Sequence, residues 1–129
     1  MLDIREHMFV IRKQQVQALS AGRMDAFVGR LVRHLRDDFP QYLRAHALPE
    51  ENLEPMVRTG LKEAEQYGVI YESDVERYIE CMAMLGPAFP RDSTFPWAGE
   101  TLRRHDLDGR AKMDLISDHV AFEVEALPR

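Results

Sequence analysis

The sequence contains a single cysteine, Cys81, and no long hydrophobic run. One cysteine cannot form a disulfide within the chain, and such sparse use of cysteine is typical of the reducing cytoplasm. The longest apolar runs extend over a few residues, whereas a membrane-spanning helix needs about 20. No segment combines the charged start, apolar core and small-residue cleavage site of a signal peptide. We therefore expect a cytoplasmic protein with no membrane span.

The sequence also lacks the common motifs of catalysis and cofactor binding. It has no glycine-rich phosphate loop, no Cys-x-x-Cys pair, no HExxH and no GxSxG. Basic residues interleaved with aromatics, which are typical of nucleic-acid binding, are missing too. The net charge is −5; residues 1–46 carry 8 Lys/Arg against 5 Asp/Glu, and residues 47–129 carry 9 against 17. These features predict a non-enzymatic protein with no cofactor, no metal ion and no nucleic-acid partner.

Apolar residues recur at the spacing of helices, and no stretch shows the sustained alternation of a β-strand. A chain of 129 residues with 45% hydrophobic residues is long enough to bury one core. The fold class that we expect is all-α: a compact single-domain bundle of about five helices over residues 9–127. Residues 1–8 are expected to form a loose leader. Met8-Phe9-Val10-Ile11 suits either a short extended segment or an apolar lid on the core.

The stretch from Ser73 to Gly86 is predicted to be the central helix. Ser73 and Glu76 have the spacing of a capping box at its start. Gly86 can adopt a left-handed conformation at its end, and Pro87 prevents its continuation. Its apolar residues cover more than one face, which indicates a helix surrounded by other elements; they are Val75, Tyr78, Ile79, Cys81, Met82, Ala83, Met84 and Leu85.

The remaining helices are predicted around this one. A long helix is expected from Arg12 to Phe39, with a break at Gly22 as an alternative. A short turn over Pro49–Leu53, or a helix from Glu54-Pro55, is expected to precede a Schellman ending at Gly68. A short helix is expected over Pro96–Arg104. Asp108 is a candidate cap for the last helix, whose predicted inner face is Ala111, Leu115, Ile116, His119, Val120 and Val124.

The loop between the central helix and the next one is the leading candidate for a binding site. It combines aromatic side chains with Arg91 and Asp92, a composition typical of binding hot spots. The predicted partner-binding residues are Phe89, Arg91, Phe95 and Trp97. Alternatively, the loop is a packed Ω-type segment whose aromatic side chains belong to the core.

Two histidines have a carboxylate four residues further along a predicted helix. His119 with Glu123, and with the adjacent Asp118, could serve a metal ion or a general base, although spacing alone supplies no further ligands. A histidine held by a carboxylate is the structural alternative. His34 and Asp38 have the same spacing and are interpreted as a surface pair. Cys81 is interpreted as a buried thiol and not as a nucleophile, because an apolar helix raises its pKa.

A spaced pattern across the chain resembles a known group of proteins. It includes Tyr67-Gly68-Val69, Ser73-Asp74-Val75-x-x-Tyr78-Ile79, Met82, Leu85-Gly86-x-x-Phe89, Asp92 and Pro96-Trp97-Ala98, and upstream the run from Phe27 to Phe39-Pro40. The pattern is similar to small all-helical bacterial proteins encoded beside type VI secretion spike-tip (PAAR-type) and effector genes. It extends over about residues 9–120 and includes no catalytic motif; Pro55 departs from it. In that group the chain begins near Phe9, which implies Met8 as an alternative start.

The resemblance implies a non-enzymatic accessory protein of a type VI secretion locus. Its expected partner is another protein, an effector, a chaperone or a spike-tip component, and its expected role is that of an adaptor or co-chaperone. One alternative is an immunity protein that neutralises a cognate toxin by charge complementarity. A second alternative is a small metal-dependent enzyme that uses His119 and Glu123. The sequence does not specify the oligomeric state.

Overall fold

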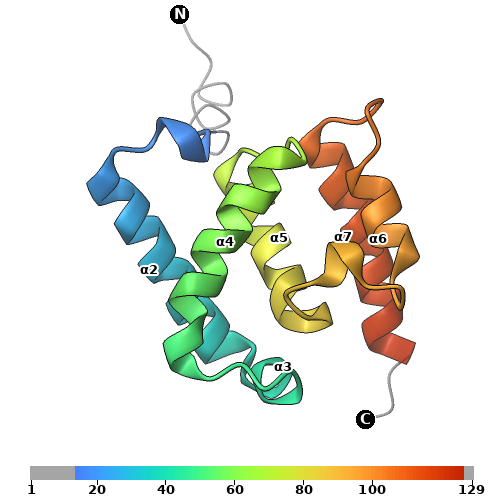
Figure 1. Cartoon of the computed structure of the whole chain (residues 1–129), viewed down its shortest axis with the longest axis horizontal. Helices are drawn as coiled ribbons and strands as arrows, with labels where there is room; N and C mark the ends of the chain where they lie inside the picture. The colour runs from blue at the N-terminus through green and yellow to red at the C-terminus, as the bar shows by residue number, and fades with distance from the viewer. Residues whose placement is uncertain (1–13, 127–129) are drawn as a thin grey trace, which may run out of the picture.

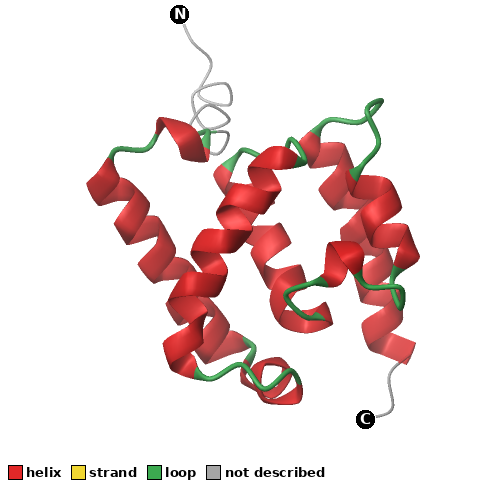
Figure 2. Cartoon of the chain, viewed as in Figure 1, coloured by secondary structure: helices red, strands yellow, loops and turns green. Residues whose placement is uncertain are grey.

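The computed structural model describes residues 14–126, and the side chains of residues 14–122. This part of the chain folds into six α-helices and three short 3₁₀ segments (Figures 1 and 2): η1 (Val16–Ala18), α2 (Ala21–Asp38), α3 (Pro40–Ala45), η2 (Glu50–Asn52), α4 (Leu53–Gln66), α5 (Glu72–Leu85), η3 (Phe89–Arg91), α6 (Pro96–Leu102) and α7 (Gly109–Ala126). Extended pairing within residues 14–126 is limited to one isolated bridge between Gln15 and Tyr71. The predicted all-α class is confirmed.

Helix α5 occupies the centre of the bundle. It contacts α2, α3, α4, α7 and η3, and lies between α4 and the α6–α7 pair in Figure 1. Tyr78, Ile79 and Met82 are almost completely buried, and so are Val75 on the same face and Cys81 and Ala83 on other faces. This burial confirms the central helix predicted from its apolar residues. None of the described helices is both long and apolar enough to cross a membrane.

The predicted capping box at the start of α5 is wrong. The helix begins at Glu72, after the extended residue Tyr71, and no side chain caps it. The carbonyl of Gln14 instead accepts a hydrogen bond from the amide of Glu72 at 3.0 Å. A neighbouring segment therefore supplies the acceptor, and Ser73 is an exposed residue of the first turn. At the other end, Gly86 has the predicted positive φ, +106°.

The long α-helix predicted from Arg12 is also wrong over residues 14–20, which lie before the start of α2. The amide of Val16 donates to the carbonyl of Ile70 at 2.8 Å, and this pairing keeps the chain extended before η1. Helix α2 begins only after Ser20, whose hydroxyl accepts from the amide of Arg23 at 3.3 Å. Gly22 is inside the first turn and does not break the helix. The segment Met8–Ile11 and the predicted leader 1–8 lie outside the described residues.

Several predicted helix ends are confirmed. Pro40 opens α3 directly after α2 ends. The 3₁₀ segment η2 precedes α4, and Pro55 falls in the first turn of α4, where its missing amide costs no hydrogen bond. Helix α4 ends in a Schellman motif at Gly68 (φ +79°): Val69 donates to the carbonyl of Ala64 at 2.8 Å, and Gly68 to that of Glu65 at 3.0 Å. Pro96 opens α6, and the carboxylate of Asp108 caps α7 by accepting from the amide of Ala111 at 2.8 Å.

The start of α7 packs directly against the turn that ends α4. A Cβ atom on Gly109 would overlap the carbonyl oxygen of Gly68 and lie 2.8 Å from the Cα atom of Val69. Both neighbours are backbone atoms, so they cannot rotate away as a side chain would. This close approach fixes the position of α7 along α4 and α5.

We expect Gly109→Ala to lower the free energy of unfolding by about 1–3 kcal/mol, because the new methyl group forces two backbone segments apart. The measurement is urea unfolding followed by circular dichroism. Gly22→Ala is the matched control: its Cβ would meet no atom within 4 Å, and stability should stay the same or rise by up to about 1 kcal/mol. Equal stabilities of the two variants would contradict the close approach at Gly109.

Candidate functional site

The four predicted partner-binding residues do not share one environment. Phe89 is fully buried in η3, and its ring centroid lies 5.2 Å from that of Tyr78 in α5. Phe89 is therefore a core residue and offers no contact area to a partner, which corrects the expectation that it belongs to the binding surface. Arg91 is exposed, and Phe95 and Trp97 are partly exposed.

Arg91 joins the loop to the body of the protein. Its guanidinium lies 3.4 Å from one carboxylate oxygen of Glu63 in α4, and the other oxygen of Glu63 accepts a hydrogen bond from the hydroxyl of Tyr78 at 3.0 Å. Burial and the negative charge of Glu63 raise the pKa of Tyr78 well above its usual value, so the phenol stays protonated and donates. Glu63 thereby links α4, α5 and η3.

Phe95 and Trp97 form an aromatic cluster with a side chain of α7. The indole of Trp97 stacks face to face on the imidazole of His119, with ring centroids 4.6 Å apart and an angle of 11° between the planes. Phe95 meets Trp97 edge-on at 6.0 Å. The indole Nε1 atom of Trp97 is buried and has no hydrogen-bond partner within the described part of the chain. Such stacks hold aromatic side chains in fixed orientations.

Helix α7 extends this cluster with two exposed apolar side chains. Leu115 is 38% exposed and Phe122 is 72% exposed. The spacing of residues 115, 119 and 122 places all three side chains on one face of α7. The predicted inner face is wrong for Leu115 and His119, because α7 turns Met113, Ile116 and Val120 toward the core. We call Phe95, Trp97, Leu115, His119 and Phe122 the α6–α7 surface.

Lys112 holds α6 and α7 together beneath this surface. Its side chain is buried, and its ammonium group donates to the carbonyls of Tyr67 at 2.7 Å and Leu102 at 2.8 Å. These carbonyls lie at the C-terminal ends of α4 and α6, where helices carry unsatisfied acceptors and negative potential. Desolvation lowers the pKa of Lys112 below its usual value. No spacing rule marks a buried lysine, so this role could not be predicted from the sequence.

A second polar cluster joins α2 to α5. The Nδ1 atom of His34 lies 2.8 Å from the carboxylate of Asp38, and its Nε2 atom lies 2.7 Å from Glu80 and 4.0 Å from Glu76. Partial burial lowers the pKa of His34, but the hydrogen bonds that its ring donates to Glu80 and Asp38 and the charges of Glu80 and Glu76 outweigh it and raise this pKa. The contact with Asp38 is confirmed, whereas the contacts with α5 were not predicted.

The other candidate residues are less suited to a chemical role in this structure. His119 is stacked on Trp97, and the side chain of Glu123 lies outside the described residues, so the proposed metal-dependent pair stays a prediction. Cys81 is buried as predicted, and burial raises the pKa of its thiol to about 12. A thiol in this environment is a poor nucleophile at neutral pH.

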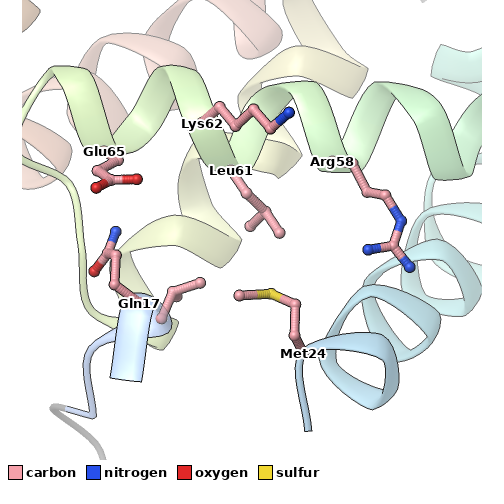
Figure 3. Close-up of a pocket in the computed structure, with 7 residues that line it drawn as sticks. Gln17, Met24, Arg58, Leu61, Lys62 and Glu65 are labelled. Carbon is pink, nitrogen blue, oxygen red and sulfur yellow. The ribbon is translucent and has the colours of Figure 1, made fainter. Parts of the chain in front are cut away.

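A small pocket of about 280 Å³ lies between η1, α2 and α4. Figure 3 shows Leu61 of α4 and Met24 of α2 on opposite sides of it, with Gln17 and Glu65 to one side. Arg58 also lines the pocket, but its guanidinium is bound by Asp25 at 2.9 Å and Glu54 at 3.1 Å. The volume is slightly below that of typical small-molecule sites. The pocket therefore suits an apolar side chain better than a metabolite.

Comparisons of the chain with protein-family models, with curated proteins and with solved structures find no match.

We expect Lys112→Met to lower the free energy of unfolding by about 1–3 kcal/mol, because two helix-end carbonyls lose a charged donor. The emission of Trp97, the sole tryptophan, should shift to the red as α6 loosens from α7. Urea unfolding and fluorescence measure the two effects. Lys62→Met, which alters an exposed lysine of α4, is the control and should leave both unchanged. Two variants with the same stability would show that the buried ammonium group does not hold these helices.

Proposed function

We propose that this chain is a non-enzymatic accessory protein of a type VI secretion locus. In this proposal it acts in the cytoplasm and binds an effector, a chaperone or a spike-tip component through the α6–α7 surface. The type VI assignment rests on the resemblance of the sequence pattern from Tyr67 to Ala98. The position of the binding surface rests on the exposed apolar side chains of α7 beside the Trp97–His119 stack.

The single observation that supports this surface is the exposure of Phe122. A phenylalanine with 72% of its surface in water gains free energy when a partner covers it. Leu115 and the stacked pair of Trp97 and His119 lie on the same side of α7, so a partner that covers Phe122 meets further apolar groups. Tryptophan and other aromatic side chains dominate the energetics of protein interfaces. The surface therefore suits a partner with an apolar patch of its own.

Of the predicted loop residues, Phe95 and Trp97 belong to this surface, and Arg91 lies in η3, which packs against α6. Arg91 makes one long contact with Glu63, at 3.4 Å, and its exposed guanidinium can pair with an acidic group of a partner. Charge pairs at the rim of an interface mainly govern the association rate, whereas the apolar centre governs the lifetime of the complex.

We expect Phe122→Glu to weaken binding to the partner at least tenfold, because it places a charge in the apolar contact area. The experiment co-expresses the chain with each neighbouring gene product and measures the affinity of any complex that co-purifies. Ala26→Glu is the matched control, since Ala26 is exposed on α2, far from α6 and α7 in Figure 1. Binding should also move the emission of Trp97 to shorter wavelength.

Two results would contradict the proposal. Consistent recovery of the chain alone, with every neighbouring product tested, would argue against an accessory role. A complex whose affinity is unchanged by both Phe122→Glu and Leu115→Glu would exclude the α6–α7 surface. The immunity alternative, which the net charge of −5 favours, makes a different prediction: the neighbouring product is toxic by itself and harmless when this chain is co-expressed.

A further inference from the structure

Three side chains that commonly bind metal ions converge where α2 meets α5. One donor atom each from His34, Glu76 and Glu80 lies within 4.8 Å of the other two. Glu76 and Glu80 are four residues apart, so both carboxylates lie on the same face of α5. All three side chains are partly exposed, and an ion can therefore enter from solvent without any opening of the fold.

The contacts of His34 require a positive charge at its Nε2 atom. Asp38 lies 2.8 Å from Nδ1 and Glu80 lies 2.7 Å from Nε2. An ionised carboxylate only accepts hydrogen bonds, and a neutral imidazole has only one N–H group. If that hydrogen is on Nδ1 and binds Asp38, the lone pair of Nε2 faces the oxygen of Glu80. The close approach is then stable only with a cation at Nε2. A second proton forms the 2.7 Å hydrogen bond directly, whereas a metal ion bound to both atoms at about 2.0–2.2 Å moves them slightly further apart.

The arrangement of the donors fits a transition-metal ion. Histidine ligands of metal ions usually donate their other N–H group to a carboxylate, as Nδ1 of His34 can to Asp38. An imidazole nitrogen suits Zn²⁺ and its neighbours, whereas Mg²⁺ and Ca²⁺ prefer sites made of oxygen alone. Glutamates and histidines on facing helices form metal sites in other helical bundles. Three protein ligands leave one position of a tetrahedral Zn²⁺ ion for water.

The surrounding contacts keep these side chains in place. The ring of Phe39 packs edge-on against the imidazole of His34 at 5.2 Å, which restricts its rotation. One turn earlier on both helices, Arg30 and Glu72 form an ion pair at 3.7 Å. One ion pair therefore aligns the two helices and one aromatic contact orients the imidazole, and the donors lie on helices and not on a loop.

We propose that His34, Glu76 and Glu80 bind one divalent transition-metal ion, with Asp38 as a positioning residue for the imidazole. The ion joins α2 to α5 through its own bonds and compensates the three carboxylates that surround one histidine. This site lies on a different pair of helices from the α6–α7 surface. It therefore does not depend on the proposed function.

The test is a titration of the full chain with Zn²⁺ at pH 7.5, against a competing fluorescent chelator. We expect one ion per chain, and a loss of affinity of at least tenfold in His34→Gln and in Glu80→Gln. Asp38→Asn should weaken binding by about tenfold or more, as is typical of groups that orient a ligand. His105→Gln is the matched control, because His105 is exposed between α6 and α7, and its affinity should equal that of the wild type.

Glu76→Gln separates metal binding from structural effects. The carboxylate of Glu76 lies 4.0 Å from Nε2, beyond hydrogen-bond distance, so its loss should hardly alter the metal-free protein. The same change should still weaken Zn²⁺ binding at least tenfold and reduce the rise of the melting temperature that Zn²⁺ causes. No binding below about 1 mM Zn²⁺ would overturn the proposal. Binding that is unchanged by both His34→Gln and Glu76→Gln would overturn it too.

Discussion

The enclosure of α5 is the constraint on which the rest of the structure depends. Tyr78, Ile79 and Met82 lie with Val75 on one face of this helix, and all four are buried. Cys81 and Ala83, which are buried too, extend its apolar surface to other faces. A helix that is apolar on several faces must be covered on several faces. Helices α2, α4 and α7 therefore each pack on a different part of α5, and the chain between them must return to it repeatedly.

The few polar residues of α5 determine how its neighbours are attached. Arg77 donates to the buried carboxylate of Asp74 and to Asp114 of α7, both at 2.8 Å. Glu80 binds His34 of α2, and the hydroxyl of Tyr78 binds Glu63 of α4. Hydrogen bonds with charged partners are directional, so each of them selects one orientation of a helix that apolar packing alone would leave variable. The apolar core stabilises the bundle and these contacts fix its geometry.

The α6–α7 surface follows from this arrangement. Helix α7 uses Met113, Ile116 and Val120 to cover α5, and Lys112 to bind the ends of α4 and α6. Helix α6 is short and covers only the flank of α7 at the Trp97–His119 stack. Leu115 and Phe122 therefore remain exposed. The exposed apolar side chains of α7 are those that its packing within the fold leaves uncovered.

Much of the helical order could be predicted from local signals in the sequence. The Schellman ending at Gly68, the cap at Asp108, the end of α2 before Pro40 and the helix start at Pro96 depend on residues within one turn of each other. Interactions with distant segments were not predictable in this way. The carbonyl of Gln14 replaced the expected cap at Ser73, and pairing with Ile70 kept the chain extended before η1.

The candidate sites also combine features that local sequence signals predicted with features that depend on contacts between distant segments. The aromatic loop pointed to Phe95 and Trp97, but composition could not separate them from Phe89, which is buried against Tyr78. The exposed face of α7 was missed because Leu115 was assigned to the core by its apolar character, whereas the buried side includes Lys112 and Met113. The spacing of His34 and Asp38 was visible in the sequence, whereas the approach of Glu80 from α5 depends on how two helices cross.

Native-state hydrogen exchange of the backbone amides tests the central role of α5 most directly. If α5 is the helix on which all others pack, the amides from Val75 to Leu85 should exchange only through global unfolding. Those of α2 and α7 should exchange faster, through partial openings that leave α5 covered. Amides in α5 that exchange faster than those of α2 or α7 would contradict the account.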